Sequence, residues 1–195
     1  MSITKLLPLS KGKLDVLFEI YAEGQDYLRN ISRKLKMNPS QSFRILNSLY
    51  KAKIVVKKEI GNEIQYSMSK DYDSEPVIIV LEEYHLYKIV DRSDALKAVL
   101  ALIFSNKKLF NSSDKIYLFG SYVTGNATKN SDIDLLFVNE DNKLVGKACR
   151  EMSVVSGVTI NPLIYTKKKF KDELKKGEAL LSSIVNNVKN RAIVK

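Results

Sequence analysis

Apolar residues recur at helical spacing in three segments near the start of the chain, and this spacing predicts three helices. The segments are residues 10–23, 27–36 and 40–52. Serine is a common capping residue, so we expect Ser10 and Ser40 to cap the first and third helices. On the third helix, the positions expected to face inward are Phe43, Leu46, Leu49 and Tyr50.

The pattern changes to alternation after the third segment. Residues 54–69 alternate between apolar and polar positions, and Gly61-Asn62 interrupts them at a point suited to a two-residue turn. A β-hairpin is therefore predicted here. Three helices followed by a hairpin is the element order of a winged helix-turn-helix domain, which we assign to residues 1–70.

The remaining chain predicts a second domain of class α+β. Residues 71–76 are acidic and contain a proline, so we place a linker at 71–84 and the second domain at 85–195. Apolar patterning there favours a small mixed sheet flanked by helices. Helices are expected at 77–110, at 143–155 and from 166 onward with a break at Gly177, and strands at 115–119, 133–138, 158–165 and 192–194.

Composition and charge narrow the class of protein. The chain has 195 residues, is 45% hydrophobic and contains one cysteine, Cys149, which excludes an internal disulfide. We see no signal peptide and no apolar run long enough for a membrane span, so we expect a cytoplasmic protein that does not enter a membrane. The net charge is +10, and residues 1–70 carry 13 Lys and Arg against 6 Asp and Glu. Such a basic segment favours nucleic acid as a partner.

The predicted third helix carries side chains suited to DNA. In a helix-turn-helix, this helix lies in the major groove, where Gln, Asn and Arg read base edges and Ser and Lys hold phosphates. We expect DNA contacts from Ser40, Gln41, Ser42, Arg44, Asn47 and Lys51, and from Lys57 and Lys58 on the hairpin. Further phosphate contacts are expected from Arg33, Lys34 and Lys36. The alternative is an ordinary solvated helix face or a protein-docking module.

The segment ISRKLKMNPSQSFRILNSLYKAKIVVKKEIGNEIQYSMS resembles the winged helix-turn-helix domains of prokaryotic regulators. The resemblance covers residues 10–70. It implies DNA binding, and a homodimer is an open expectation because such regulators are often two-fold symmetric. One departure is Lys53, at a position where these modules often have glycine.

The stretch LFGSYVTGNATKNSDIDLLFV, residues 118–138, carries the candidate chemistry. Asp132 and Asp134 alternate on a predicted strand, so their carboxylates share one face, where a divalent cation such as Mg²⁺ would remove their repulsion. Gly120 lets the backbone approach closely, and Ser121 opens a short helix whose N–H groups and hydroxyl suit a phosphate. Gly125 begins the loop that returns the chain toward that phosphate.

The motif GSYVTGNATKNSDIDLLF resembles the signature of polymerase-β-like nucleotidyltransferases, in particular minimal prokaryotic ones, over about residues 85–195. The resemblance implies transfer of a nucleoside monophosphate from a nucleoside triphosphate to an acceptor hydroxyl. It assigns Asp132 and Asp134 to catalysis and to Mg²⁺ or Mn²⁺. The predicted nucleotide-binding residues are Gly120, Ser121, Gly125 and Ser131. If the chain acts as antitoxin members of this group do, the acceptor is a tyrosine hydroxyl of a partner protein.

One expected feature is missing. The family usually supplies a third carboxylate from a later strand, but residues 157–165 offer only Thr159, Asn161 and Leu163 on the matching face. Asn161 can ligate a metal but is a very poor base, and general-base catalysis typically contributes about 10²–10⁴-fold. Two hypotheses stay open: a DNA-binding nucleotidyltransferase, or a transcriptional regulator whose nucleotidyltransferase fold binds nucleotide or mediates dimerisation with little catalysis. Substitutes that we consider for the missing group are Glu140, Asp141 and Glu151.

Overall fold

The computed structural model describes residues 9–70 and 75–195. The chain divides into two compact units, and the boundary along the chain lies between Tyr84 and His85. Residues 71–74 of the expected linker lie outside the described residues. The remainder of that linker belongs to helix α4 (Glu75–Val90), whose first half packs Val77, Val80 and Leu81 into the core of the first unit.

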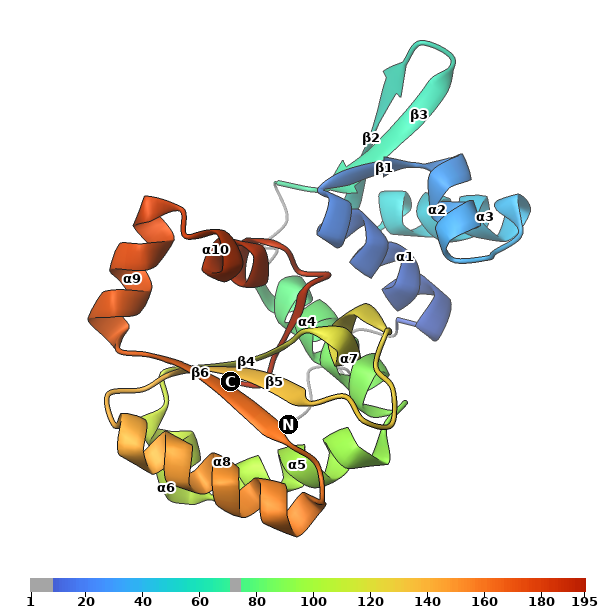
Figure 1. Cartoon of the computed structure of the whole chain (residues 1–195). Coiled ribbons are helices and arrows are strands. Elements are labelled where there is room, and N and C mark those ends of the chain that lie inside the picture. Colours follow the sequence, from blue (N-terminus) through green and yellow to red (C-terminus); the bar gives the residue numbers. More distant parts are fainter. Residues whose placement is uncertain (1–8, 71–74) are drawn as a thin grey trace. The chain divides into compact units, whose positions relative to one another are not determined.

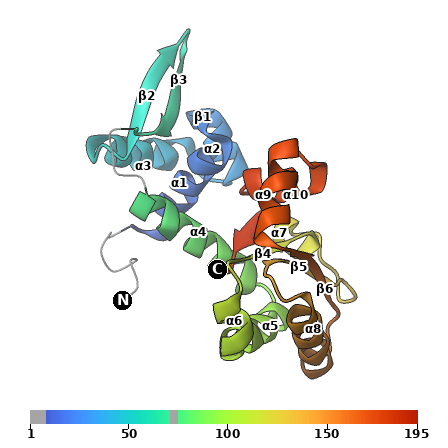
Figure 2. The ribbon, with the colours of Figure 1, turned by 90° about the vertical axis from the view of Figure 1, so that its left-hand side faces the viewer.

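The first unit is a winged helix-turn-helix, as its patterning predicts (Figures 1 and 2). Its three antiparallel strands are paired in the order β1-β3-β2, and Ile60 pairs with Glu63 across the Gly61-Asn62 turn. The short strand β1 was not predicted, since three residues give no readable period. The elements are α1 (Lys11–Glu23), β1 (Gln25–Tyr27), α2 (Leu28–Lys34), α3 (Pro39–Lys51), β2 (Val55–Ile60) and β3 (Glu63–Met68).

The ends of these helices follow local chemistry. Asn38, not Ser40, caps α3: its side chain accepts a hydrogen bond from the backbone N–H of Ser40, and Pro39 occupies the first helical position. The prediction for Ser40 was therefore wrong by two residues. Ser10 does occupy the N-cap position of α1, but its side chain makes no capping hydrogen bond. Lys53 has φ = +58°, the left-handed conformation that glycine adopts most easily.

Helix α3 buries a narrower stripe than expected. Leu46 and Leu49 are buried as predicted, and Ser42 completes the stripe one turn earlier. Phe43 and Tyr50, predicted to face inward, are 49% and 40% exposed. They lie seven residues apart on one flank of the helix, where Lys57 Nζ lies 4.8 Å from the centre of the Tyr50 ring. Hydrophobicity alone could not show that this flank faces away from the core.

The second unit is of class α+β, with a mixed sheet in the order β6-β5-β4-β7 (Figure 1). Strand β5 pairs antiparallel with β4 and parallel with β6, and β7 pairs antiparallel with β4. Among the described residues, no helix is both long and apolar enough to cross a membrane. The elements are α5 (Asp94–Ser105), α6 (Lys107–Ser112), β4 (Lys115–Phe119), α7 (Ser121–Thr124), β5 (Ile133–Val138), α8 (Asn142–Ser156), β6 (Ile160–Tyr165), α9 (Lys167–Lys176), α10 (Ala179–Asn186) and β7 (Arg191–Ile193).

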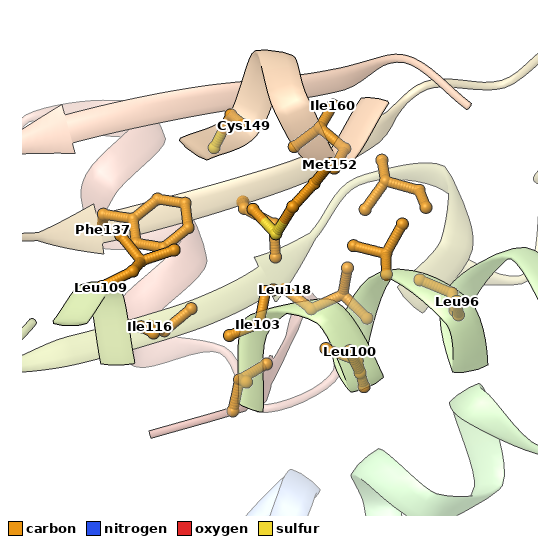
Figure 3. Close-up of a cluster of buried hydrophobic side chains, with 14 of the residues drawn as sticks. Leu96, Leu100, Ile103, Leu109, Ile116, Leu118, Phe137, Cys149, Met152 and Ile160 are labelled. Atoms are coloured by element: carbon orange, nitrogen blue, oxygen red, sulfur yellow. The ribbon is translucent and has the colours of Figure 1, made fainter. Parts of the chain in front are cut away.

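Apolar side chains cover both faces of this sheet. Odd-numbered residues of β5, such as Phe137, join residues of α5 and α8 in the larger cluster (Figure 3). Even-numbered residues, such as Leu136, pack against α9 and α10. Cys149 belongs to the larger cluster, and burial raises the pKa of its thiol to about 12, so it is a core residue and not a nucleophile. Because Asp134 shares the parity of Leu136, its carboxyl lies on the α9–α10 face of the sheet.

Candidate active site

The strand register brings the predicted site residues together. Phe119, the last residue of β4, pairs with Asp134 on β5, and Asp134 pairs in turn with Asn161 on β6. The three paired side chains lie in one row on one face of the sheet. Gly120, which follows Phe119 directly, is therefore held beside Asp134, and the turn and the carboxylates meet at one corner of the sheet.

Gly120 is pressed directly against the Asp134 carboxylate. Its backbone has φ = +78° and ψ = −152°, a combination that is open essentially only to glycine. A Cβ atom built at Gly120 would lie 2.2 Å from Asp134 Oδ2. Helix α7 begins at the next residue, and its first internal backbone bonds run from the N–H groups of Val123 and Thr124 to the carbonyl of Gly120. The N–H groups of Ser121 and Tyr122 come earlier in the chain than the N–H groups that make these bonds.

The side-chain amide of Asn161 connects the two aspartates. Its Nδ2 donates hydrogen bonds to Asp132 Oδ2 at 3.0 Å and to Asp134 Oδ1 at 3.4 Å. Burial raises the pKa of Asp134, and the neighbouring Asp132 charge raises it further, while the hydrogen bond from Asn161 acts in the opposite direction. The third position of the site is therefore next to both carboxylates, as strand pairing predicts, but it holds a neutral amide.

The loop between α7 and β5 is held by its own polar groups. Gly125 ends α7 in the left-handed conformation, with φ = +81°. The Ser131 hydroxyl accepts a hydrogen bond from the backbone N–H of Thr128 at 2.8 Å, and the Tyr122 hydroxyl donates to the carbonyl oxygen of Ser131 at 3.4 Å. The observed contacts of Ser131 thus order the loop that leads into Asp132.

The acidic residues considered as substitutes lie elsewhere. Glu140 accepts a hydrogen bond from the backbone N–H of Lys167, Asp141 caps α8 at Leu144, and the Glu151 carboxylate is 3.8 Å from Lys147 Nζ. Glu140 follows Asp134 by six residues along and beyond β5, a span of roughly 20 Å. Neither Glu140 nor Asp141 reaches the carboxylate pair from that end of the sheet.

The donor set suits one divalent cation. Asp132 and Asp134 present oxygens to a single amide group, so both carboxylates converge on one small region of space. Mg²⁺ is commonly held by one or two carboxylates together with phosphate oxygens and water. Over residues 9–70 and 75–195, no group of three or more His, Cys, Asp and Glu side chains is placed to hold a metal ion. The aspartate pair therefore offers two carboxylate ligands, and the third position of the site holds a neutral amide in place of an acidic ligand.

A cavity of about 780 Å³ lies beside this site, a volume typical of small-molecule sites. It shares Gly125 with the predicted nucleotide-binding residues, whereas Asp132 and Asp134, both described residues, are not part of its lining. Two cationic side chains, Arg92 and Lys129, contribute to its wall. The cavity adjoins the motif loop but does not surround the carboxylate pair.

In the first unit, most predicted DNA-contacting side chains are accessible. The exposed residues are Ser40, Gln41, Arg44, Asn47, Lys51, Lys57 and Lys58. Ser42 is fully buried, so its prediction as an outward-facing DNA contact was wrong. Phe43 takes its place among the exposed residues of α3. The sequence missed this because Phe43 reads as part of the apolar stripe.

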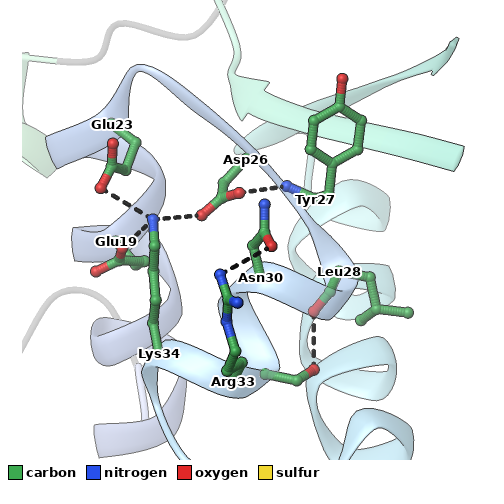
Figure 4. Close-up of polar contacts among 9 residues, drawn as sticks. Glu19, Glu23, Asp26, Tyr27, Leu28, Asn30, Arg33 and Lys34 are labelled. Carbon is green, nitrogen blue, oxygen red and sulfur yellow. Dashed lines mark hydrogen bonds and ion pairs between the residues drawn. The ribbon is translucent and has the colours of Figure 1, made fainter.

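Lys34 also has a different surrounding from the one expected. Its Nζ lies 2.9 Å from Glu19, 2.9 Å from Glu23 and 2.8 Å from Asp26 (Figure 4). Burial lowers the pKa of Lys34, but the hydrogen bonds that its ammonium donates to these carboxylates outweigh burial and hold the pKa well above its ordinary value. Lys34 therefore joins α1, β1 and α2 and is not available for DNA phosphates as predicted.

Strand β4 leads into a Gly-Ser turn that packs against the Asp-x-Asp strand β5, which is the arrangement that the resemblance to nucleotidyltransferases implies. Residues 101–194 match the family model described as "Nucleotidyltransferase domain", and this part of the chain is a nucleotidyltransferase domain of the polymerase-β-like class. It is preceded by a winged helix-turn-helix domain that the family model does not cover.

Individual proteins also match parts of the chain. A Methanocaldococcus jannaschii protein named "Putative protein adenylyltransferase" is 38% identical over 61 residues, which is 31% of this chain and 61% of that protein. A MarR protein from Peptoclostridium difficile is 22% identical, with a TM-score of 0.39, over 54% of this chain and 72% of its own. A toxin–antitoxin structure with AMP-PNP is 19% identical, with a TM-score of 0.36, over 53% of this chain and 73% of its own. At these TM-scores, neither structure bears on function.

Proposed function

We propose that this protein binds DNA through its winged helix-turn-helix domain and transfers a nucleoside monophosphate from a nucleoside triphosphate to an acceptor hydroxyl. The single observation that carries the transfer proposal is the packing of Gly120 against Asp134. An added Cβ would lie 2.2 Å from Asp134 Oδ2, so backbone and carboxylate approach each other as closely as only glycine allows. This proximity supports the proposal that the Gly120–Ser121 turn binds phosphate beside a cation held by Asp132 and Asp134.

Each part of the site has a separate task in this reaction. Asp132 and Asp134 would hold Mg²⁺ or Mn²⁺, and the bound cation would neutralise negative charge on the phosphates. The turn at Gly120 and Ser121 presents backbone N–H groups to the triphosphate. The acceptor oxygen forms a bond to the α-phosphorus, the bond from that phosphorus to the bridging oxygen breaks, and pyrophosphate leaves. The hydroxyl proton passes to solvent, because Asn161 cannot accept it.

Labelled nucleoside triphosphates, Mg²⁺ and cell extract provide the test. We expect label transfer by the unaltered protein and a fall to background in a variant with Asp132→Ala and Asp134→Ala, since both cation ligands are then lost. Glu151→Ala is the matched control, because it removes an exposed carboxylate that pairs with Lys147 away from the site. Transfer by the double variant at the original rate would contradict the proposal.

The acceptor that we propose is a tyrosine hydroxyl of a partner protein. The name of the Methanocaldococcus jannaschii relative supports a protein acceptor. A tyrosine hydroxyl is the acceptor if the chain acts as antitoxin nucleotidyltransferases do. Mass spectrometry of the labelled product would locate the nucleotide. Label recovered on a nucleic acid or a small molecule would overturn this assignment while leaving the transfer activity in place.

A second candidate function is a regulator whose nucleotidyltransferase fold binds nucleotide with little turnover. The observation that favours it is Asn161, whose amide stands beside both aspartates where a third carboxylate would complete the site. Under this hypothesis, nucleotide binding depends on metal and on both aspartates, but no label is transferred. The same assay therefore separates the two functions.

DNA binding by the first unit is expected to weaken steeply as salt rises. Each DNA phosphate that the protein neutralises contributes a slope of about −0.9 in log K against log[salt]. Replacing the exposed Arg44 and Lys51 by Ala should make the slope shallower by roughly 2. A variant with Lys168→Ala and Lys171→Ala in α9 removes the same charge from the other unit and should keep the slope. Fluorescence anisotropy on duplex DNA measures both, and a flat salt dependence would contradict DNA binding.

A further inference from the structure

We infer that Asn161 makes this site a receptor for the metal–nucleotide complex and a poor site for the free divalent cation. The inference rests on the proposed function, because it assumes that the Asp132–Asp134 pair is the cation site. It adds what the site recognises: cation and nucleoside triphosphate together. Asn161 acts in this as a positioning residue that works through the two aspartates.

The side-chain amide of Asn161 is hydrogen-bonded to both carboxylates of the proposed cation pair. One nitrogen, Asn161 Nδ2, donates to Asp132 Oδ2 at 3.0 Å and to Asp134 Oδ1 at 3.4 Å. Its two N–H groups are partly positive, so they offset some of the repulsion between the carboxylates. The parallel pairing of Asp134 with Asn161 fixes this arrangement in the backbone. The two carboxylates therefore have a partner before any cation arrives.

A cation that enters the pair must displace these N–H groups from the carboxylate oxygens. In return, the cation interacts with the two negative charges of Asp132 and Asp134, whereas a site with a third carboxylate would offer three. Mg²⁺ gives up its water reluctantly, so two carboxylates and a neutral amide compensate poorly for its dehydration. A nucleoside triphosphate brings its own anionic oxygens to the same ion and is held at the Gly120–Ser121 turn. The pair should consequently take the ion mainly in complex with nucleotide.

Thermodynamic linkage turns this into a measurable quantity. If nucleotide raises the affinity for the cation, the cation must raise the affinity for nucleotide by the same factor. Mn²⁺ is a suitable probe, because electron paramagnetic resonance reports the unbound ion directly. A non-hydrolysable α,β-methylene analogue of ATP keeps the measurement independent of turnover.

For the unaltered protein, we expect the analogue to tighten Mn²⁺ binding at least about tenfold. In Asn161→Asp, Mn²⁺ alone should bind roughly tenfold or more tightly, because ligand charge is a main determinant of affinity, and the coupling should shrink. Asn142→Asp is the matched control: it makes the same chemical change at the exposed first residue of α8, at the other end of the sheet. It should leave both constants unchanged.

The outcomes separate this inference from the proposed function. Tight binding of free Mn²⁺ by the unaltered protein, equal to that of Asn161→Asp and independent of nucleotide, would overturn the inference and leave the proposed function standing. If neither the unaltered protein nor Asn161→Asp bound Mn²⁺ or the analogue under any combination, the cation site itself would be refuted.

Discussion

Gly120→Ala is expected to lose nucleotide binding by about 100-fold or more. Two independent features of Gly120 require glycine. Its φ of +78° with ψ of −152° is costly for any residue with a side chain, on the order of 1–3 kcal/mol. In addition, the new methyl would lie 2.2 Å from Asp134 Oδ2, 3.1 Å from its Cγ and 3.3 Å from its Cβ. The turn, the carboxylate or both must move.

This movement affects both halves of the site. A shift of about 1 Å in a positioning group can lower the rate of a catalysed reaction about 10²-fold. Here the proposed phosphate-binding turn and a proposed cation ligand are displaced together. Equilibrium dialysis with a labelled nucleoside triphosphate and Mg²⁺ measures the loss. Urea unfolding followed by circular dichroism shows whether the fold persists.

Gly146→Ala provides the control for this substitution. Gly146 lies inside helix α8, it is not among the positive-φ glycines, and a methyl there would meet only Arg150 Nη1 at 3.7 Å. Because Ala is the better helix former, stability should rise by up to about 1 kcal/mol with nucleotide binding unchanged. Nucleotide binding by Gly120→Ala equal to that of the unaltered protein would show that the turn is not part of the site.

Much of the fold could be predicted from the sequence because its signals are local. The Gly61-Asn62 turn fixes the hairpin register, and the strands at 115–119 and 133–138 begin and end as expected. Predictions on α3 failed where a local pattern does not decide the outcome. Phe43 is apolar yet exposed, and Ser42 is polar yet buried, since the packing of α3 against the other elements determines which stripe is covered.

In the candidate site, too, features set by local sequence could be predicted and features set by distant pairing could not. The proximity of Gly120 to the Asp-x-Asp strand followed from the motif, which lies within one short stretch of sequence. The bridging amide of Asn161 did not, because it depends on the parallel pairing of β5 with β6 across 27 residues of chain. For the same reason, the sequence predicted a DNA contact for Lys34. The carboxylates that pair with Lys34 lie in other elements, so they can be identified only in the folded structure.

Lys34→Met is expected to destabilise the winged helix-turn-helix unit by about 3 kcal/mol. Removing one partner of a buried ion pair typically costs about 3–5 kcal/mol, since the other charge stays buried without compensation. Three carboxylates face Lys34 Nζ, and the side chains of Glu19 and Asp26 are only 10% and 6% exposed. The Lys34 side chain itself is 33% exposed, so solvent screening places the expected cost at the lower end of that range.

Hydrogen exchange of the full-length protein measures this loss locally. Amides of α1 and α2 should exchange roughly 100-fold faster in Lys34→Met, while those of the sheet in the second unit should keep their rates. Lys36→Met is the matched control, because Lys36 is exposed and surface substitutions usually change stability by less than about 0.5 kcal/mol. Adding Glu19→Gln and Asp26→Asn to Lys34→Met should restore part of the protection, since two buried negative charges are then removed. Unchanged exchange in Lys34→Met would mean that the cluster of Lys34 with Glu19, Glu23 and Asp26 contributes little to folding.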